Sequence, residues 1–166
     1  WEWFSLNNYN DEAQKRVDEY DILIKEVDAI YNSLPDNRKD SFYQMVVYNV
    51  KGAGLHNKKV LYAQKSHAYG KENRASAARY AALAQQVEND IDQLIDHYNR
   101  KQVTVGDKWN HMASLPGPWG AQWQQWAMPP LDYNSGNGNP RMDLSVEGGD
   151  KSKLAGFSVF NKDKRF

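Results

Sequence analysis

The chain contains no cysteine, and this absence excludes several kinds of chemistry at once. Disulfides, thiolate zinc sites, iron–sulfur clusters and cysteine nucleophiles all require that residue. No apolar run approaches the roughly 18 residues that a membrane-spanning helix needs. The 21 basic and 21 acidic side chains cancel, so no net charge attracts nucleic acid or an anionic membrane surface. We therefore expect neither nucleic acid nor a membrane among the partners.

The sequence also lacks the motifs of metal, cofactor and covalent chemistry. The four histidines are scattered and form no His-Glu-x-x-His pair: His56, His67, His97 and His111. Neither a phosphate-binding loop, a dinucleotide fingerprint nor a Gly-x-Ser-x-Gly elbow is present. Acidic pairs on the predicted helices lie opposite the apolar stripes, where carboxylates are solvated. The sequence therefore predicts no metal, no cofactor and no catalytic residue within this chain.

Two long segments have helical periodicity, and the length of 166 residues fits one ordinary domain. In residues 10–34, apolar side chains recur at steps of three and four: Ala13, Val17, Tyr20, Ile24, Val27, Tyr31 and Leu34. Residues 74–100 repeat the pattern with Tyr80, Ala84, Val87, Ile91, Leu94 and Tyr98. Such stripes are typical of helices that pack one face against a core. The first helix is expected to start at Asn10 as its N-cap.

The segment between these two helices is more fragmented. Pro35 suits the first position of a second helix. Residues 52–54 read Gly-Ala-Gly, and because glycine costs about 1 kcal/mol in a helix interior, we expect a break or kink there. A third helix is expected beyond it, ending near Gly70. The fold class predicted is all-α, an antiparallel bundle of about four to five helices.

A loop region rich in tryptophan and proline follows the last predicted helix. Its candidate contact residues are Lys108, Trp109, Asn110, His111, Trp119, Trp123 and Trp126. Flat indole rings beside amide and imidazole groups can stack on sugars and bond their hydroxyls. The same rings could instead cover the end of the bundle or fill a seam against a neighbouring domain. The pattern alone leaves sugar contact and interdomain contact open.

Composition divides the chain into four parts. Residues 1–9 are expected to lead in from a preceding domain, because the chain starts Trp-Glu-Trp-Phe without Met, as an excised piece would. Residues 10–133 form the helical bundle with its tryptophan-rich loop. Residues 134–140 have a linker composition of Asn, Ser, Gly and Pro. Residues 141–166 alternate polar and apolar side chains, which predicts a short C-terminal β segment that starts another domain.

Four blocks in this order resemble the helical segment that follows the catalytic barrel in glycoside hydrolase family 115. The blocks are residues 7–12, 35–50, 69–77 and 108–112. Residues 146–148 look like the opening of that family's C-terminal β-sandwich, to which residues 141–166 would then belong. The resemblance covers roughly residues 5–130. Members of the family are xylan α-1,2-glucuronidases.

This resemblance implies a parent enzyme that removes glucuronic acid or its 4-O-methyl ether from glucuronoxylan and that is periplasmic or secreted. The chain would be its non-catalytic helical accessory domain, packed against the barrel of the same polypeptide and contributing to a homodimer contact. The family's catalytic residues belong to the barrel, so none is placed on this chain. Two alternatives remain: an autonomous carbohydrate-binding module that uses the tryptophan-rich loop, and a stand-alone helical interaction protein.

Overall fold

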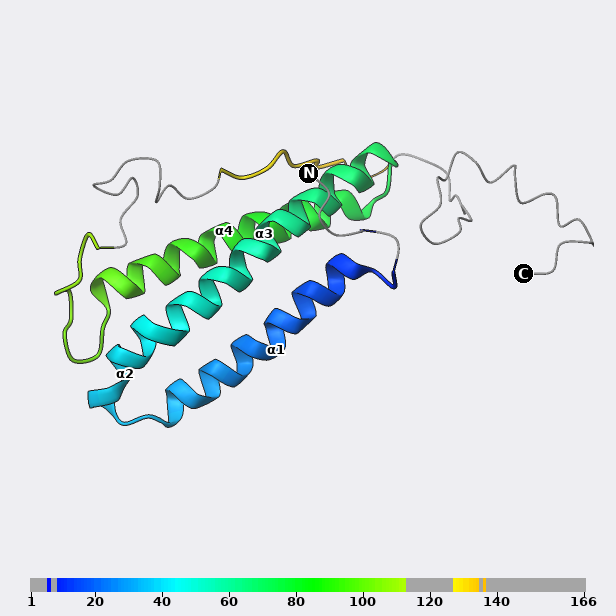
Figure 1. Cartoon of the computed structure of the whole chain (residues 1–166). Coiled ribbons are helices and arrows are strands. Elements are labelled where there is room, and N and C mark those ends of the chain that lie inside the picture. The colour runs from blue at the N-terminus through cyan, green and yellow to red at the C-terminus, as the bar shows by residue number, and fades with distance from the viewer. Residues whose placement is uncertain (1–5, 7–8, 113–126, 135, 137–166) are drawn as a thin grey trace, which may run out of the picture.

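The computed structural model describes residues 6, 9–112, 127–134 and 136, and this part of the chain is mostly helical. Its elements are α1 (Glu12–Ser33), α2 (Asp36–Phe42), the π-helix η1 (Tyr43–Val47), α3 (Tyr48–Lys71) and α4 (Ser76–Arg100). Because α2, η1 and α3 follow one another without interruption, they make one rod, antiparallel to α1 and α4 (Figure 1). The helical class is thus confirmed for the described residues, and the predicted β segment lies outside them.

Helices α1 and α4 form where the apolar periodicity predicts them. On α1 the buried side chains are Ala13, Val17 and Val27, and on α4 they include Ala84, Val87, Ile91, Leu94 and Tyr98. The N-cap of α1 is Asp11 and not Asn10, because the Asp11 carboxylate accepts a hydrogen bond from the backbone N–H of Gln14 at 3.1 Å. Helix α1 ends at Ser33, just before Leu34 and Pro35, because the residue that precedes a proline disfavours the helical conformation.

The predicted break at residues 52–54 is wrong, since α3 runs straight through them. A Cβ atom added to Gly54 would lie 2.9 Å from Cδ1 of Ile24 and 3.2 Å from Cδ1 of Tyr20 on α1. The missing side chain of Gly54 therefore lets α1 approach closely, and the packing gained offsets the low helix propensity of glycine. The described residues form three long rods, because α2, η1 and α3 are continuous, and a bundle of four to five separate helices is not confirmed for them.

Helix α3 is the central rod, because it contacts both α1 and α4 (Figure 1). Two of its lysines have almost no exposed surface: Lys59 is 0% exposed and Lys65 is 1% exposed. The Lys59 ammonium lies 2.9 Å from Oε2 of Glu88 on α4. The Lys65 ammonium lies 3.0 Å from Oδ2 of Asp11 at the start of α1. Each of these buried lysines is thus paired with a partly exposed carboxylate, since the side chains of Glu88 and Asp11 are 23% and 42% exposed.

Buried apolar side chains gather in two clusters. One consists of Val27, Tyr43, Val47, Leu94 and Tyr98, with Tyr31, Phe42, Tyr48 and Trp109 among the partly buried residues packed against it. The other consists of Leu6, Ala13, Val17 and Leu61. We call the end of the bundle that holds the first cluster, made by α2, η1 and the loop of residues 101–112, the aromatic end.

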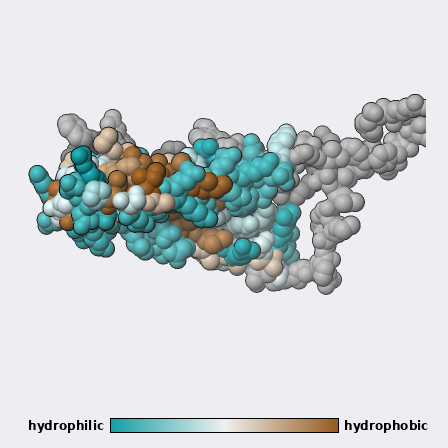
Figure 2. All heavy atoms as spheres, turned by 90° about the horizontal axis from the view of Figure 1, so that it is seen from below, coloured by the Kyte–Doolittle hydropathy of each residue, from teal (hydrophilic) through white to brown (hydrophobic). Residues whose placement is uncertain are grey.

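Some large apolar side chains remain at the surface. Ile22, Leu23 and Ile30 of α1 are 59%, 41% and 49% exposed, whereas Met45, Val103 and Met112 belong to the aromatic end. The view from below in Figure 2, onto the side where α1 lies in Figure 1, shows brown apolar patches among hydrophilic residues. No helix within the described ranges is long and apolar enough to cross a membrane.

Two glycines two residues apart in α3 provide a matched test of the close approach to α1. Gly52 has open space, because its added Cβ would meet only Cδ2 of Leu94 at 3.9 Å, an ordinary contact. We expect Gly52→Ala to raise the free energy of unfolding by about 0.5 to 1 kcal/mol through helix propensity. Gly54→Ala should lower the free energy of unfolding by about 1 kcal/mol. The overpacking of the new methyl group against Tyr20 and Ile24 costs more than the gain in helix propensity. Urea unfolding of both variants checks this, and equal stabilisation by the two would contradict the packing described.

Candidate functional site

The loop at the aromatic end is held by one carboxylate. Asp40, near the end of α2, is only 5% exposed. Its Oδ1 accepts the backbone N–H of Val103 at 2.6 Å, and its Oδ2 accepts those of Thr104 and Val105 at 2.7 and 3.0 Å. The Thr104 hydroxyl also donates to Oδ2. A backbone bridge between Gln102 and Gly106 closes the turn, so the loop wraps around Asp40.

The surroundings of Asp40 favour its charged form. Burial by itself would raise the pKa of this carboxyl, but the hydroxyl and N–H of Thr104, together with the N–H groups of Val103 and Val105, outweigh burial and lower its pKa below the usual value. Asp40 is therefore ionised at neutral pH, and it joins α2 to the loop that follows α4. No local sequence pattern marks Asp40, because its hydrogen-bond partners lie more than sixty positions away.

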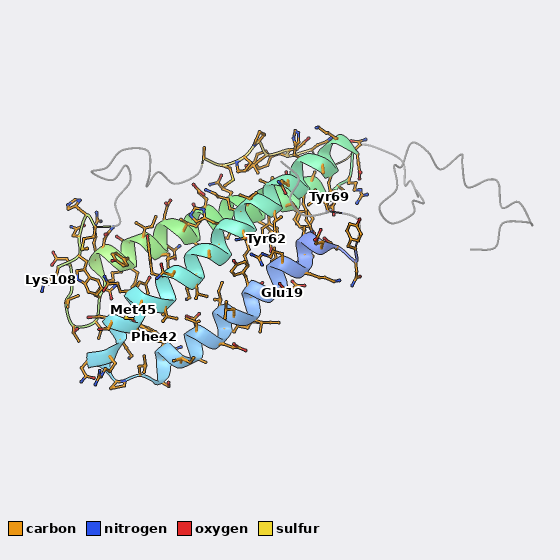
Figure 3. All side chains as sticks on the ribbon, viewed as in Figure 1. Glu19, Phe42, Met45, Tyr62, Tyr69 and Lys108 are labelled. Carbon is orange, nitrogen blue, oxygen red and sulfur yellow. The ribbon has the colours of Figure 1, made fainter. Side chains whose placement is uncertain are left out.

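The π-helix η1 begins three residues after Asp40 and widens the helical turn at the aromatic end. The amide of Asn49 donates to the carbonyl oxygens of Gln44 and Met45 at 3.2 and 3.0 Å, which gives these carbonyls a partner within the wider turn. The Gln44 amide donates to the hydroxyl of Tyr98 at 3.3 Å. Met45 is left 73% exposed at the outer side of this turn. Figure 3 shows Met45 and Phe42 at the same end as Lys108.

Tyr43 and His97 form the interior of this end. Their rings stack with centroids 4.3 Å apart, and the Tyr43 hydroxyl donates to the Leu94 carbonyl at 3.2 Å. Burial raises the pKa of Tyr43. Burial, together with the nearby charges of Lys101 and Lys51, lowers the pKa of His97, so its imidazole is neutral at pH 7. Two neutral stacked rings of this kind stabilise the packing of η1 against α4.

The predicted contact residues fall into two groups. Lys108 and His111 are exposed, while Trp109 and Asn110 are half-buried in the turn that ends at residue 112. The Trp109 ring lies 5.6 Å from that of Tyr98 and packs against the aromatic cluster. The side chain of Asn110 accepts the N–H of His111 at 3.0 Å. Trp109 thus covers the end of the bundle, whereas Trp119, Trp123 and Trp126 lie outside the described residues.

A small open pocket of about 240 Å³ lies between α3 and α4. It is lined by Tyr48, Asn49, Gly52, Ala53, His56, Ile91, Leu94 and Ile95. Burial and the charge of Lys59 lower the pKa of His56. Glycoside hydrolysis generally requires a pair of carboxylates, and none of these lining residues is acidic. The lining of this pocket is therefore mainly apolar with a few polar groups, and it lacks the carboxylate pair that glycoside hydrolysis requires.

Residues 127–134 and Gly136 lie at the opposite end of the bundle. The Ser66 hydroxyl donates to the carbonyl of Asp132 at 2.8 Å and accepts the N–H of Asp132 at 2.9 Å. The Asn134 amide donates to Oδ1 of Asn73 in the turn between α3 and α4 at 3.0 Å. Gly136 lies so close to this turn that an added Cβ would be 2.8 Å from the N of Ala75. The first residues of the predicted linker are thus fixed to the bundle.

The polar side chains discussed above make structural contacts, and within the described part of the chain they build no recognisable reaction centre. Among the described residues, no group of three or more His, Cys, Asp and Glu side chains is placed to hold a metal ion. Comparison with known proteins gives no match to any family model and no match to any curated protein sequence. Function must therefore be argued from the surface that the bundle presents.

The anchoring role of Asp40 predicts a pH-dependent loss of stability. We expect Asp40→Asn to lower the free energy of unfolding by about 2 to 4 kcal/mol at pH 7, because charge-assisted hydrogen bonds to the loop are lost. The lowered pKa means that this stabilisation is complete above about pH 4, the ordinary range for aspartate, and is lost as the pH falls further. Urea unfolding between pH 3 and 7 should show the two proteins converging at the acid end. The exposed control, Asp92→Asn, should change the free energy of unfolding by less than about 0.5 kcal/mol at every pH. A difference in stability between wild type and Asp40→Asn that persists unchanged to pH 3 would contradict the role given to the charge of Asp40.

Proposed function

We propose that this chain is a non-catalytic helical domain that works by packing against another protein surface. The observation that carries the proposal is the construction of the aromatic end. There a buried aspartate fixes a loop, and three large apolar side chains stay at the surface: Met45, Val103 and Met112, exposed by 73%, 46% and 65%. Exposed apolar groups on a rigid base are typical of contact surfaces between domains.

The partner we propose is the catalytic barrel of a xylan α-1,2-glucuronidase in the same polypeptide. The four blocks that resemble glycoside hydrolase family 115 support this choice, and block 35–50 includes Asp40 and all of η1. In this proposal the barrel removes glucuronic acid or its 4-O-methyl ether from glucuronoxylan, and the helical domain supports it. Residues 134–140 then lead to a β-sandwich that opens within residues 141–166. The enzyme would be periplasmic or secreted, and a homodimer contact would be a further role of the bundle.

The second candidate is an autonomous carbohydrate-binding module. Trp109 argues against it, because one ring of the supposed stacking platform already packs against Tyr98. Trp119, Trp123 and Trp126 keep this candidate open, since they lie outside the described residues. Sugar stacking changes the surroundings of an indole ring, so binding would alter tryptophan fluorescence.

Two titrations of the purified chain separate these candidates. With glucuronoxylan oligosaccharides we expect no change in tryptophan fluorescence, whereas a saturable change would favour the binding module. With a separately produced family 115 catalytic barrel that lacks its own helical segment, we expect one co-eluting complex in size-exclusion chromatography. Met45→Asp/Met112→Asp should weaken that complex at least tenfold, because charge is introduced at the contact.

The matched control is Gln85→Asp, an exposed position on α4 more than two turns before Leu94 and so away from the aromatic end. It should leave the complex intact. Failure of the wild-type chain to associate with the barrel would contradict the proposed partner. Equal weakening by Gln85→Asp and by the double variant would contradict the proposed contact surface.

A further inference from the structure

Helix α1 has an apolar stripe on its outer side that the bundle does not cover. Ile22, Leu23 and Ile30 are 59%, 41% and 49% exposed. Glu19 and Glu26, also exposed, lie on the same ridge at helical steps of three and four from these residues. We call these five residues the α1 stripe. It presents apolar side chains with one glutamate in each turn, over roughly 12 Å between Ile22 and Ile30.

The charge of α1 indicates the kind of surface that fits the stripe. Residues 12–33 contain six acidic and three basic side chains, so a second α1 would meet it with like charge. A complementary occupant would have apolar side chains flanked by lysine or arginine. Residues 151–166 have this composition: five basic side chains against one acidic, arranged on both sides of an apolar group that includes Leu154, Phe157 and Phe160.

The described chain that leads toward residues 151–166 is fixed to the bundle near the start of α1. On α3, Lys65 contacts Asp11 at the start of α1, and the next residue, Ser66, is bonded to Asp132. The fixed chain continues to Gly136 beside Ala75. The α1 stripe begins about 12 to 17 Å along the helix from Asp11. The fourteen residues 137–150 can span up to roughly 45 Å, which is ample for this distance.

We propose that residues 151–166 dock on the α1 stripe of their own chain. Their apolar side chains would cover Ile22, Leu23 and Ile30, and their lysines would face Glu19 and Glu26. This contact is independent of the aromatic end, so it can fail while the proposed function holds, and the reverse. It would hold the opening of the proposed β-sandwich, to which these residues also belong, directly against the helical bundle.

The absence of native cysteine allows a direct test by an engineered disulfide. Leu23→Cys/Phe157→Cys places one thiol on the α1 stripe and one in the docking segment. Under mild oxidation at low salt we expect an intramolecular disulfide to form at least tenfold faster than in the matched control, Gln93→Cys/Phe157→Cys, whose first thiol is on the exposed side of α4. Mass spectrometry and non-reducing electrophoresis distinguish the cyclised monomer from linked dimers.

Charge reversal tests the electrostatic part of the contact. Adding Glu19→Lys/Glu26→Lys to the first pair should slow the disulfide at least threefold, whereas Asp90→Lys/Asp92→Lys on α4 should not. Raising the salt from 0.1 to 1 M should remove this difference, because the Debye length falls from about 10 to 3 Å. Equal rates for the two cysteine pairs would overturn the proposal. Linked dimers as the main product would also overturn it and assign the stripe to the segment of a second copy.

A zero-length carbodiimide crosslink tests the same contact on the unmodified protein, so no substitution can alter the fold or the contact. Lys153, Lys162 or Lys164 should be joined to Glu19 or Glu26 within one chain, as identified by mass spectrometry of the monomer fraction. Crosslinks from these lysines that are spread evenly over the acidic residues of α1 and α4 would contradict docking on the stripe.

Discussion

The two lysines buried in α3 constrain the arrangement of the whole bundle. Lys59 and Lys65 have no appreciable contact with solvent, and each lies within 3.0 Å of a carboxylate on a neighbouring helix. The attraction within each pair contributes little net stability, because desolvation of the buried ammonium group cancels most of it. An uncompensated buried charge, however, costs about 3 to 5 kcal/mol. Sliding α1 or α4 along α3 would leave an ammonium group without its partner, so these pairs define the register of the three rods.

The aromatic end depends on this register. Leu94 and Tyr98 of α4 meet Tyr43 and Gln44 only if α4 is correctly placed along the rod that contains η1. The end of α4 also determines where the following loop begins, and therefore whether its N–H groups reach Asp40. The close approach at Gly54 has the same role for α1, because it brings Tyr20 and Ile24 against α3. The proposed contact surface is thus positioned by interactions far from it.

Sequence patterns were sufficient for the two outer helices and insufficient for the central one. In α1 and α4 each helix buries one face, so their apolar residues recur at helical steps and their positions could be predicted. Helix α3 is packed on two sides and buries Gly54, Lys59, Lys65 and Ser66, which leaves no single apolar stripe to detect. Helix propensity predicts a break at residues 52–54 because it reports only the local cost of glycine, whereas the benefit of Gly54 comes from its contact with Ile24, thirty positions earlier.

The candidate site was predicted only in part for a similar reason. The aromatic composition around Trp109 drew attention to the loop, and the ring does pack on the bundle. The residue that fixes the loop, Asp40, has no local signature, because its partners come from Val103, Thr104 and Val105. The exposure of Met45 depends on the π-helix, which no helical periodicity of 3.6 residues describes.

A double-mutant cycle between Lys59 and Glu88 tests the central claim most directly. The free energy of unfolding in urea is measured for wild type, Lys59→Met, Glu88→Gln and the double variant. If this pair fixes α4 on α3, the two changes are strongly coupled, by about 2 kcal/mol or more, because the second substitution removes a partner that is already lost. Effects that add within about 0.5 kcal/mol would show that the two groups do not act on each other, and would contradict the account of how the bundle is aligned.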